Sequence, residues 1–400
     1  MKVLSSVFKW LMYVAFGMSV FFQTATAQID LNKTEPERAS AAMILEQPVN
    51  DARIKNRQHE LVSSIAASAD GKQIFIAWYT GGKGEGPGNY VTLAVSLDNG
   101  KTWKNDQLVV YPKEATTRFF DPVLWRDKNG KVWLFYAVGL KTKEKQIWDL
   151  KGGVNAISIA WNGKKVTHSQ PSLLSYGVMM NKPVYIPQKD MALFPVSVWQ
   201  LGKDNSKDPE YVQDGTFIHS IDYKANSKVL ATYGSVPVLA DSMRTFDEHQ
   251  VVQISEKGEL LCLLRAKPGI YYSRSKDFGK SWSTLQPFTA SGPTNSARFY
   301  IGKLQSGNLI LILNSSKTRN NMTAFISKDG GKTWPHKLLL DNREMVSYPD
   351  LDQTHDGKLH VTYDHDRSGA KDIFYCNFRE EDILEGNTEN IFRTRINPLP

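Results

Sequence analysis

From about Leu61 onward the chain alternates short apolar runs with polar turns. Runs such as IFIAWYT, VWLFYAV and NLILILN are separated, about every ten residues, by D-G, N-G, S-G or K-G pairs. Such runs are typical of β-strands, and Gly beside Asn or Asp is typical of the turns between them. Few segments keep a helical period beyond two turns. The pattern predicts an all-β sandwich, barrel or propeller.

An eight-residue motif, S-x-D-x-G-x-[TS]-W, decides between these architectures. It occurs at residues 96–103, 275–282 and 327–334. In this spacing the Asp side chain turns the chain through hydrogen bonds to the backbone, the Gly takes a positive φ, and the Trp packs back on the turn. Three copies in one chain indicate a repeated structural unit.

Each octamer belongs to a larger unit of three or four short strands. Units of this kind begin near Leu61, Asp121, Asn181, Glu248, Ser296 and Tyr348. Their spacing of about 50 to 65 residues is typical of propeller blades, so we expect one six-bladed β-propeller over residues 28–400. The second and third blades are assigned by spacing alone, because they lack the octamer. We expect residues 41–47, AAMILEQ, to supply a strand that closes the ring with the last blade.

The first 27 residues have the form of a signal peptide. Lys2 and Lys9 precede or interrupt an apolar run, and the small residues Ala25 and Ala27 mark a cleavage site. No later run of about 20 apolar residues follows, so we expect an exported protein with no stable membrane anchor. The formal net charge of +8 is spread without a basic block, which makes nucleic acid a poor partner.

The sequence predicts neither a metal site nor a cofactor. Cys262 and Cys376 are the only cysteines, too few for a multi-cysteine metal site. Both lie in apolar runs, which favours two buried small hydrophobes over a disulfide. The segment from Asp364 to Arg367 carries two Asp and one His, but strand alternation sends neighbours to opposite faces. We therefore interpret it as a solvated strand edge.

The octamers, or Asp boxes, and the order of the units resemble the sialidase superfamily. The resemblance is closer to its branch of bacterial exported proteins with a BNR repeat-like domain, and it extends from about Ala52 to Leu384. Three further phrases are similar to that branch, at residues 181–183, 246–249 and 347–351. The resemblance implies a six-bladed sialidase-like propeller whose Asp boxes lie on outer turns. Chemistry is then expected where the inner strands converge.

The resemblance also implies a set of reacting groups. Sialidases attack with a Tyr that a Glu activates, and they bind the sugar carboxylate with three arginines. Tyr348 and Glu248 match the Tyr and the Glu, and Arg265 and Arg319 match two of the arginines. A neutral phenol avoids the repulsion that a carboxylate nucleophile meets at an anionic sugar, and guanidinium groups bind carboxylates in bidentate fashion. This set implies an exo-acting glycoside hydrolase of an acidic or complex glycan.

The first unit departs from the sialidase pattern. No arginine stands in register within residues 57–64, where His59 and Glu60 are nearest to the expected position. The acid/base Asp is expected within residues 84–89, where Glu85 is the only acidic residue. A glycosidase needs a proton donor at the leaving oxygen. The candidate replacements are His59, His249 and Glu85.

Further polar residues open the units and are candidates for substrate binding. They are Asp121, Lys182, Arg298 and Asp350. Each either contacts substrate, as Arg298 would by holding an anionic group, or pairs with the others at the rim.

Two alternatives to a sialidase-like hydrolase stay open. One is a polysaccharide lyase or a His-dependent glycosidase, with His59 or His249 as base and Tyr348 as acid on a uronic acid. The other is a propeller that binds glycans without chemistry. All three hypotheses predict a glycan or oligosaccharide as partner.

Overall fold

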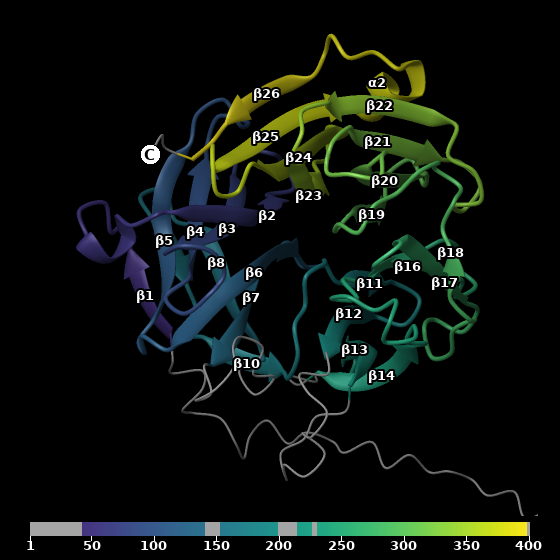
Figure 1. Ribbon diagram of the computed structural model, residues 1–400, viewed down its shortest axis with the longest axis horizontal. Helices are drawn as coiled ribbons and strands as arrows, with labels where there is room; N and C mark the ends of the chain where they lie inside the picture. The colour runs from purple at the N-terminus through teal and green to yellow at the C-terminus, as the bar shows by residue number, and fades with distance from the viewer. Residues whose placement is uncertain (1–41, 141–152, 199–213, 226–229, 398–400) are drawn as a thin grey trace, which may run out of the picture.

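The computed structural model describes residues 42–140, 153–198, 214–225 and 230–397. In these ranges six antiparallel sheets surround a common axis, as Figure 1 shows, and the predicted six-bladed propeller is confirmed. The predicted signal peptide, residues 1–27, lies outside the described residues. Within the described ranges, no helix is long and apolar enough to cross a membrane.

Each sheet is built from strands that follow one another in sequence, beginning at the axis. The first sheet contains β2 (His59–Ala67), β3 (Ile74–Gly81), β4 (Tyr90–Ser96), β5 (Lys104–Pro112) and β1 (Ala42–Glu46). The second contains β6 (Thr117–Arg126), β7 (Val132–Leu140), β8 (Val154–Trp161) and β10 (Ser172–Ser175), with β9 (Val166–His168) also paired to β8. The third contains β11 (Val184–Ile186), β12 (Met191–Val198), β13 (Gly215–Asp222) and β14 (Ala231–Val236).

The second half of the ring repeats this plan. The fourth sheet contains β15 (Gln250–Gln253), β16 (Leu260–Ala266), β17 (Gly269–Ser275) and β18 (Gln286–Pro287). The fifth contains β19 (Tyr300–Lys303), β20 (Leu309–Asn314), β21 (Met322–Ser327) and β22 (His336–Asp341). The sixth contains β23 (Val346–Gln353), β24 (Lys358–His365), β25 (Asp372–Arg379) and β26 (Phe392–Arg395). Two short helices complete the described elements, η1 (Ala52–Ile54) and α2 (Glu380–Glu385).

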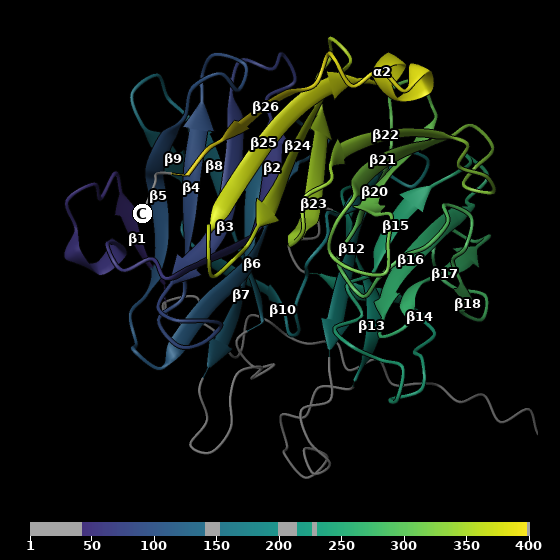
Figure 2. The same cartoon turned by 45° about the horizontal axis from the view of Figure 1, so that its top comes forward.

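The strand formed by the AAMILEQ run does not close the ring with the last blade, so that expectation was wrong. Instead β1 pairs antiparallel with β5, from Ala42 opposite Pro112 to Glu46 opposite Leu108. Figure 2 shows it at the outer edge of the first sheet. The physical reason is that β26 already pairs with β25 and supplies the fourth strand of the last sheet.

The Asp boxes form the turns between the third and fourth strands of their sheets, as the spacing predicted. In the first box the Asp98 carboxylate accepts hydrogen bonds from the Thr102 backbone amide at 2.9 Å and hydroxyl at 2.6 Å. The Ser96 hydroxyl accepts a hydrogen bond from the amide of Gly100, which has φ +84°. The Trp103 indole donates to the carbonyl of the same glycine. All of these contacts join residues within the octamer, so the turn is stabilised locally.

The core lies between the sheets, because both faces of most strands are covered by neighbouring blades. All eight residues of β3 are buried, which explains why its sequence, IFIAWYTG, is a near-continuous apolar run. Cys262 and Cys376 are both buried and unpaired, which confirms the prediction of two small core residues rather than a disulfide.

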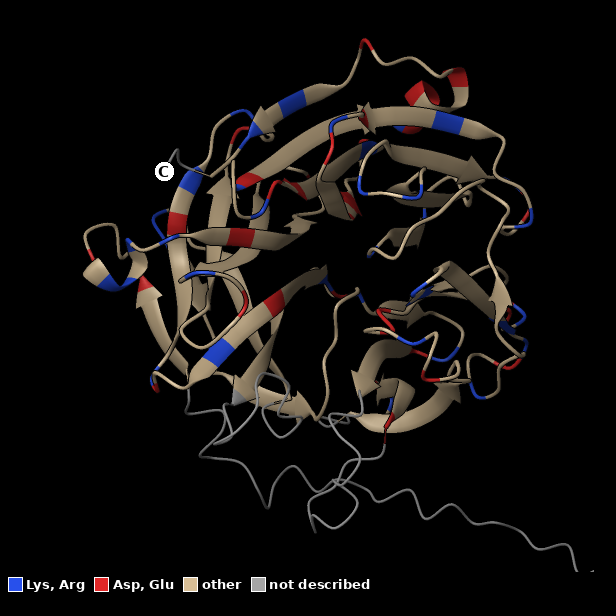
Figure 3. Cartoon of the chain, viewed as in Figure 1, with Lys and Arg blue, Asp and Glu red and all other residues tan. Residues whose placement is uncertain are grey.

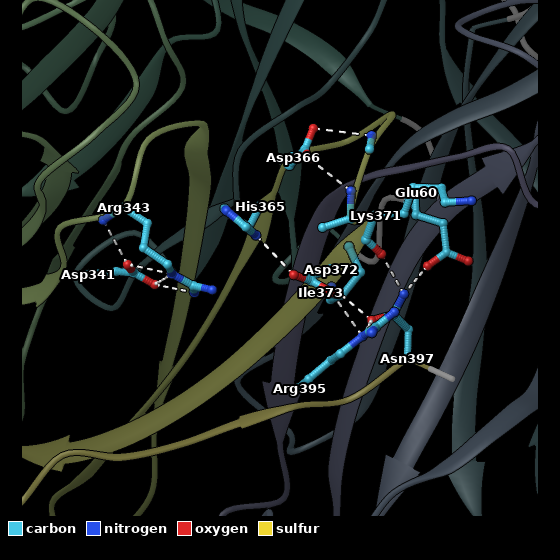
Figure 4. A network of polar contacts seen from close by, with 12 residues as sticks. Glu60, Asp341, Arg343, His365, Asp366, Lys371, Asp372, Ile373, Arg395 and Asn397 are labelled. Carbon is cyan, nitrogen blue, oxygen red and sulfur yellow. Dashed lines mark hydrogen bonds and ion pairs between the residues drawn. The ribbon is translucent and has the colours of Figure 1, made fainter. Parts of the chain in front are cut away.

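A polar network joins the end of the chain to the first blade, where a propeller ring must close (Figure 4). The Asn397 amide donates to the Glu60 carboxylate on β2 and to the carbonyl of Lys371, and it accepts a hydrogen bond from the amide of Ile373. Asp372 bridges to Arg395 at 3.0 Å. Burial raises the pKa of Glu60 to about 7, although the nearby Arg57 acts in the opposite direction. The junction therefore holds a carboxyl group that resists ionisation.

This raised pKa predicts that the free energy of unfolding falls as the pH rises through the range from 4.5 to about 7. A group whose folded pKa is raised contributes its stability below the unfolded pKa and loses it as the pH passes the folded value. The loss is on the order of 3 kcal/mol for a shift of this size. Denaturant unfolding of the protein and of Glu60→Gln between pH 4 and 8 measures it. Parallel stability curves for the two proteins would contradict the prediction.

Candidate active site

Six of the residues predicted to react or bind substrate meet in one cavity at the ring axis. The cavity has a volume of about 100 Å³. Its lining comprises Val62, Tyr79, Glu85, Asp121, Met180, Phe246, Glu248, Arg265, Arg319, Tyr348 and Arg367. Tyr348, Glu248, Arg265 and Arg319 are therefore brought together, with Glu85 and Asp121 beside them. Figure 3 shows acidic and basic positions on the strands around the axis as well as on the outer turns.

The same backbone irregularity places three of the lining residues. Val62 on β2, Asp121 on β6 and Tyr348 on β23 each sit where one extra residue interrupts the pairing with the next strand. Each has a left-handed φ, +53°, +46° and +59° respectively. A bulge of this kind redirects a side chain that regular alternation would send between the sheets. Such φ values cost energy in residues other than glycine, and they cluster at functional sites.

Tyr348 and Glu248 form a direct contact at the centre of the cavity. The Tyr348 phenol donates to the Glu248 carboxylate at 3.0 Å, and the Arg265 guanidinium donates to the same phenol oxygen at 2.8 Å and to the carboxylate at 2.7 Å. All three side chains are buried. Burial and then the charge of Glu248 raise the pKa of Tyr348, whereas the nearby arginines act in the opposite direction. The phenol is therefore neutral and already bonded to a base.

Two further arginines of the cavity lining face the Tyr348 ring, and Arg298, outside the lining, also lies over the ring with its guanidinium carbon 5.1 Å from the centroid. The guanidinium carbon of Arg319 lies 5.1 Å from the ring centroid and that of Arg367 lies 4.0 Å from it. Arg367 is also paired with Asp364 at 3.1 Å. With Arg265, the cavity thus presents three guanidinium groups around one phenol, an arrangement that favours an anionic ligand.

Arg367 is a site residue that the sequence reasoning missed. The segment from Asp364 to Arg367 is not a solvated strand edge, because Asp364 is fully buried and Arg367 lines the cavity. Strand alternation does not apply there, since β24 ends at His365 and Asp366 has a left-handed φ of +44°. The carbonyl of Arg367 accepts a hydrogen bond from the amide of Glu60 on β2. The loop therefore brings an arginine to the blade where the expected first arginine is absent.

The carboxyl groups of Glu85 and Asp121 occupy another part of the cavity lining. Glu85 pairs with the buried Arg118 at 3.6 Å, and its own side chain is 40% exposed. Asp121 is buried, and its pKa is raised to about 7 by burial and by the charge of Glu85. Arg118, the second residue of β6, was not predicted as a site residue.

Three predicted binding residues instead cross-link the inner strands. Lys182 pairs with Asp350 at 3.0 Å and donates to the carbonyl of Ile65. Asp350 also accepts a hydrogen bond from the amide of Ile65 at 2.9 Å. The guanidinium of Arg298 donates to the carbonyls of Met180, Ser63 and Tyr348. None of the three lines the cavity.

The two predicted histidines also lie outside the cavity lining. His249 is buried, and its ring contacts the carbonyl of Phe217 at 2.9 Å and the hydroxyl of Ser197 at 3.2 Å. Burial lowers the pKa of His249 to about 4. His59 contacts the Ser368 hydroxyl at 2.9 Å, and burial lowers its pKa as well. In the part of the chain that the structure describes, no group of three or more His, Cys, Asp or Glu is placed to hold a metal ion.

A larger cavity of about 610 Å³ lies at the other ends of the inner strands. Its lining includes Arg126 and Asp352, which pair at 3.2 Å, and Gln188 and Gln253, whose amides bond at 2.8 Å. Tyr348, Glu248, Arg265 and Arg319 line the smaller cavity, and none of the four lines the larger one. The smaller cavity is therefore the candidate active site.

Comparison with solved structures places this fold among the sialidase-like propellers. The Hadza microbial sialidase Hz136 matches 82% of this chain and 67% of its own with a TM-score of 0.61 at 15% identity. The leech intramolecular trans-sialidase matches 83% of this chain and 70% of its own, with a TM-score of 0.62 at 13% identity. A protein of unknown function from Dyadobacter fermentans matches 82% of this chain and 94% of its own, with a TM-score of 0.57 at 16% identity. At these identities the likeness shows the fold alone.

The chain belongs to the BNR repeat-like domain family, whose sequence profile matches residues 72–361. This confirms the resemblance that the Asp boxes indicated. No curated protein matches the chain.

The cross-linking contacts predict that Arg298→Met lowers the free energy of unfolding by about 3 kcal/mol or more. The substitution leaves three buried carbonyl groups without their donor, and each unsatisfied group costs about 1 to 3 kcal/mol. Arg319→Met is the matched control, with an expected change below about 1 kcal/mol, because its contact with Ser347 is 3.5 Å long. Urea unfolding of both variants measures the difference. Equal losses would show that Arg298 is not a cross-link.

Proposed function

We propose that the protein is an exported, exo-acting glycoside hydrolase of sialidase-like type that acts on an acidic glycan. The observation that carries this proposal is the contact of the Tyr348 phenol with both Glu248 and Arg265 inside a small buried cavity. The cavity's small volume favours a terminal sugar over an internal segment of a chain. The predicted leader supports export.

The Tyr348–Glu248 pair has the geometry of a nucleophile and its base. A phenol at 3.0 Å from a carboxylate can pass its proton to that carboxylate as its oxygen attacks the anomeric carbon. The glycosidic bond breaks in the same step, and the leaving oxygen takes a proton from an acid in the cavity. Water then attacks the anomeric carbon and gives one proton to the group that served as the acid, while the bond to the phenol oxygen breaks. The phenol oxygen recovers its proton from Glu248, and the sugar is released.

The arginines indicate an anionic substrate. Arg265, Arg319 and Arg367 approach the Tyr348 ring from three loops or strands of three different blades, and a sugar carboxylate beside the phenol would face all three. Sugar carboxylates are bound well by guanidinium groups because both are planar and oppositely charged. The solved neighbours named as sialidases support a carboxylate sugar as the first substrate class to test.

The proposal predicts that Tyr348→Phe lowers kcat on an acidic glycoside by a factor on the order of 10³ or more, because no nucleophile remains. The assay is release of free sugar from a panel of sialylated and uronic-acid glycans. Tyr136→Phe is the matched control, since the Tyr136 hydroxyl is buried without a partner in the described structure and lies outside the cavity.

Two outcomes would contradict the hydrolase. Full activity in Tyr348→Phe would exclude the tyrosine nucleophile. Binding of a glycan without release of sugar from any member of the panel would indicate a binding propeller without chemistry.

A further inference from the structure

The proposed reaction needs a proton donor that the Tyr348–Glu248–Arg265 group does not contain. Glu248 takes the proton of the phenol, so a different acid must serve the leaving oxygen. Neither His59 nor His249 lines the cavity. The remaining carboxyl groups in the lining are Glu85 and Asp121, on the first and second blades.

The backbone presents Asp121 in the same way as Tyr348. Both residues occupy the extra position of a bulge in an innermost strand, and both have a left-handed φ. Strand β6 therefore directs the Asp121 carboxyl into the same mouth of the ring as β23 directs the phenol. A non-glycine residue held at φ +46° carries a conformational cost that regular packing does not require.

Asp121 differs from the other two carboxyl groups in its contacts. Glu248 is bonded to Tyr348 and Arg265, and Glu85 is paired with Arg118. Within the described ranges, no hydrogen bond or ion pair of the Asp121 side chain is formed, although the residue is only 6% exposed. A carboxyl group that is buried and left without an internal partner is disposed to carry a proton and to share it with a ligand.

Burial and the negative charges of Glu85 and Glu248 raise the pKa of Asp121, whereas the positive charges of Arg118 and Arg298 act in the opposite direction. Burial is the main cause that raises its pKa to about 7, and the negative charge of Glu85 is the next. Titratable and charged groups of three other blades and of its own strand act on Asp121: Tyr79, Glu85, Arg118, Glu248 and Arg298. Near neutral pH, Asp121 is therefore protonated in a substantial fraction of molecules.

We propose that Asp121 is the proton donor to the leaving group, and that Glu85 is the neighbouring charge that keeps Asp121 protonated. This inference rests on the proposed hydrolase. In the first step the Asp121 proton passes to the glycosidic oxygen as the bond to the anomeric carbon breaks. In the second step the Asp121 carboxylate takes a proton from the attacking water, which restores the acid.

The test compares Asp121→Asn with Glu85→Gln on two kinds of probe, the 4-nitrophenyl and the methyl glycosides of N-acetylneuraminic acid and of glucuronic acid. Methanol is a poor leaving group and needs the acid, whereas nitrophenolate does not. Asp121→Asn should lower kcat/KM about 10² to 10⁴-fold on the methyl glycoside and less than about 10-fold on the nitrophenyl glycoside. Measured at a pH where Asp121 is still protonated in the variant, Glu85→Gln should show no such dependence on the leaving group.

The pH profiles supply a second readout. Wild-type kcat/KM should fall as the pH rises through about 7, because Asp121 loses its proton. Glu85→Gln removes a negative charge near Asp121, so this fall in kcat/KM should occur at lower pH. In Asp121→Asn the fall should be absent. Equal losses on both probes in Asp121→Asn, or a dependence on the leaving group in Glu85→Gln instead, would overturn the proposal.

An infrared titration separates this inference from the hydrolase itself. The carbonyl stretch of a protonated carboxyl group should appear in the difference between wild type and Asp121→Asn and should vanish with a midpoint near pH 7. Absence of that band overturns the proton-donor role, even if Tyr348→Phe proves inactive as expected. Full turnover in Tyr348→Phe refutes the hydrolase instead, and the proton-donor role falls with it.

Discussion

The inner strands of this ring are joined at the axis by buried charged side chains. In the described residues no strand of one sheet pairs with a strand of another, and only a few backbone hydrogen bonds, such as that of Glu60 with Arg367, join different blades. The relative positions of the sheets therefore also depend on side-chain contacts such as that of Lys182 with Asp350. Arg298 binds backbone carbonyls of three other blades, including that of Tyr348. Breaking one member of such a network leaves buried charge or carbonyl groups unpaired, which is strongly destabilising. These contacts set the distances across the candidate active site.

With the inner strands held in place, the bulges determine what the cavity contains. One extra residue in β2, β6 and β23 brings Val62, Asp121 and Tyr348 to the cavity lining at matching positions of three blades. The fold thus offers equivalent positions, and the chemistry depends on which residue stands at each. The apolar Val62 occupies the position in the blade that departs from the sialidase pattern. Arg367, from the last blade, lies where the last blade meets the first: its carbonyl accepts a hydrogen bond from the amide of Glu60, and its side chain lines the cavity.

Local sequence predicted the scaffold well, since each Asp box holds its turn through contacts within eight residues. The resemblance to sialidases, and not local sequence, proposed Tyr348, Glu248, Arg265 and Arg319, and the structure brings these four side chains to the lining of one cavity. The position of Arg367 could not be predicted, because it depends on a loop that packs against a different blade. Likewise, the pairing of β1 depends on which sheet edge remains open, and the sequence pattern of a strand does not specify its partner.

The central claim is that the Tyr348 oxygen forms a bond to the sugar. Mass spectrometry after rapid mixing with an activated, fluorinated glycosyl fluoride of N-acetylneuraminic acid tests it directly, because fluorine beside the anomeric carbon slows hydrolysis of the intermediate. The account predicts a mass increase of one glycosyl unit on the peptide that contains Tyr348, and none in Tyr348→Phe. A glycosyl adduct on another residue, or the same adduct in Tyr348→Phe, would contradict it.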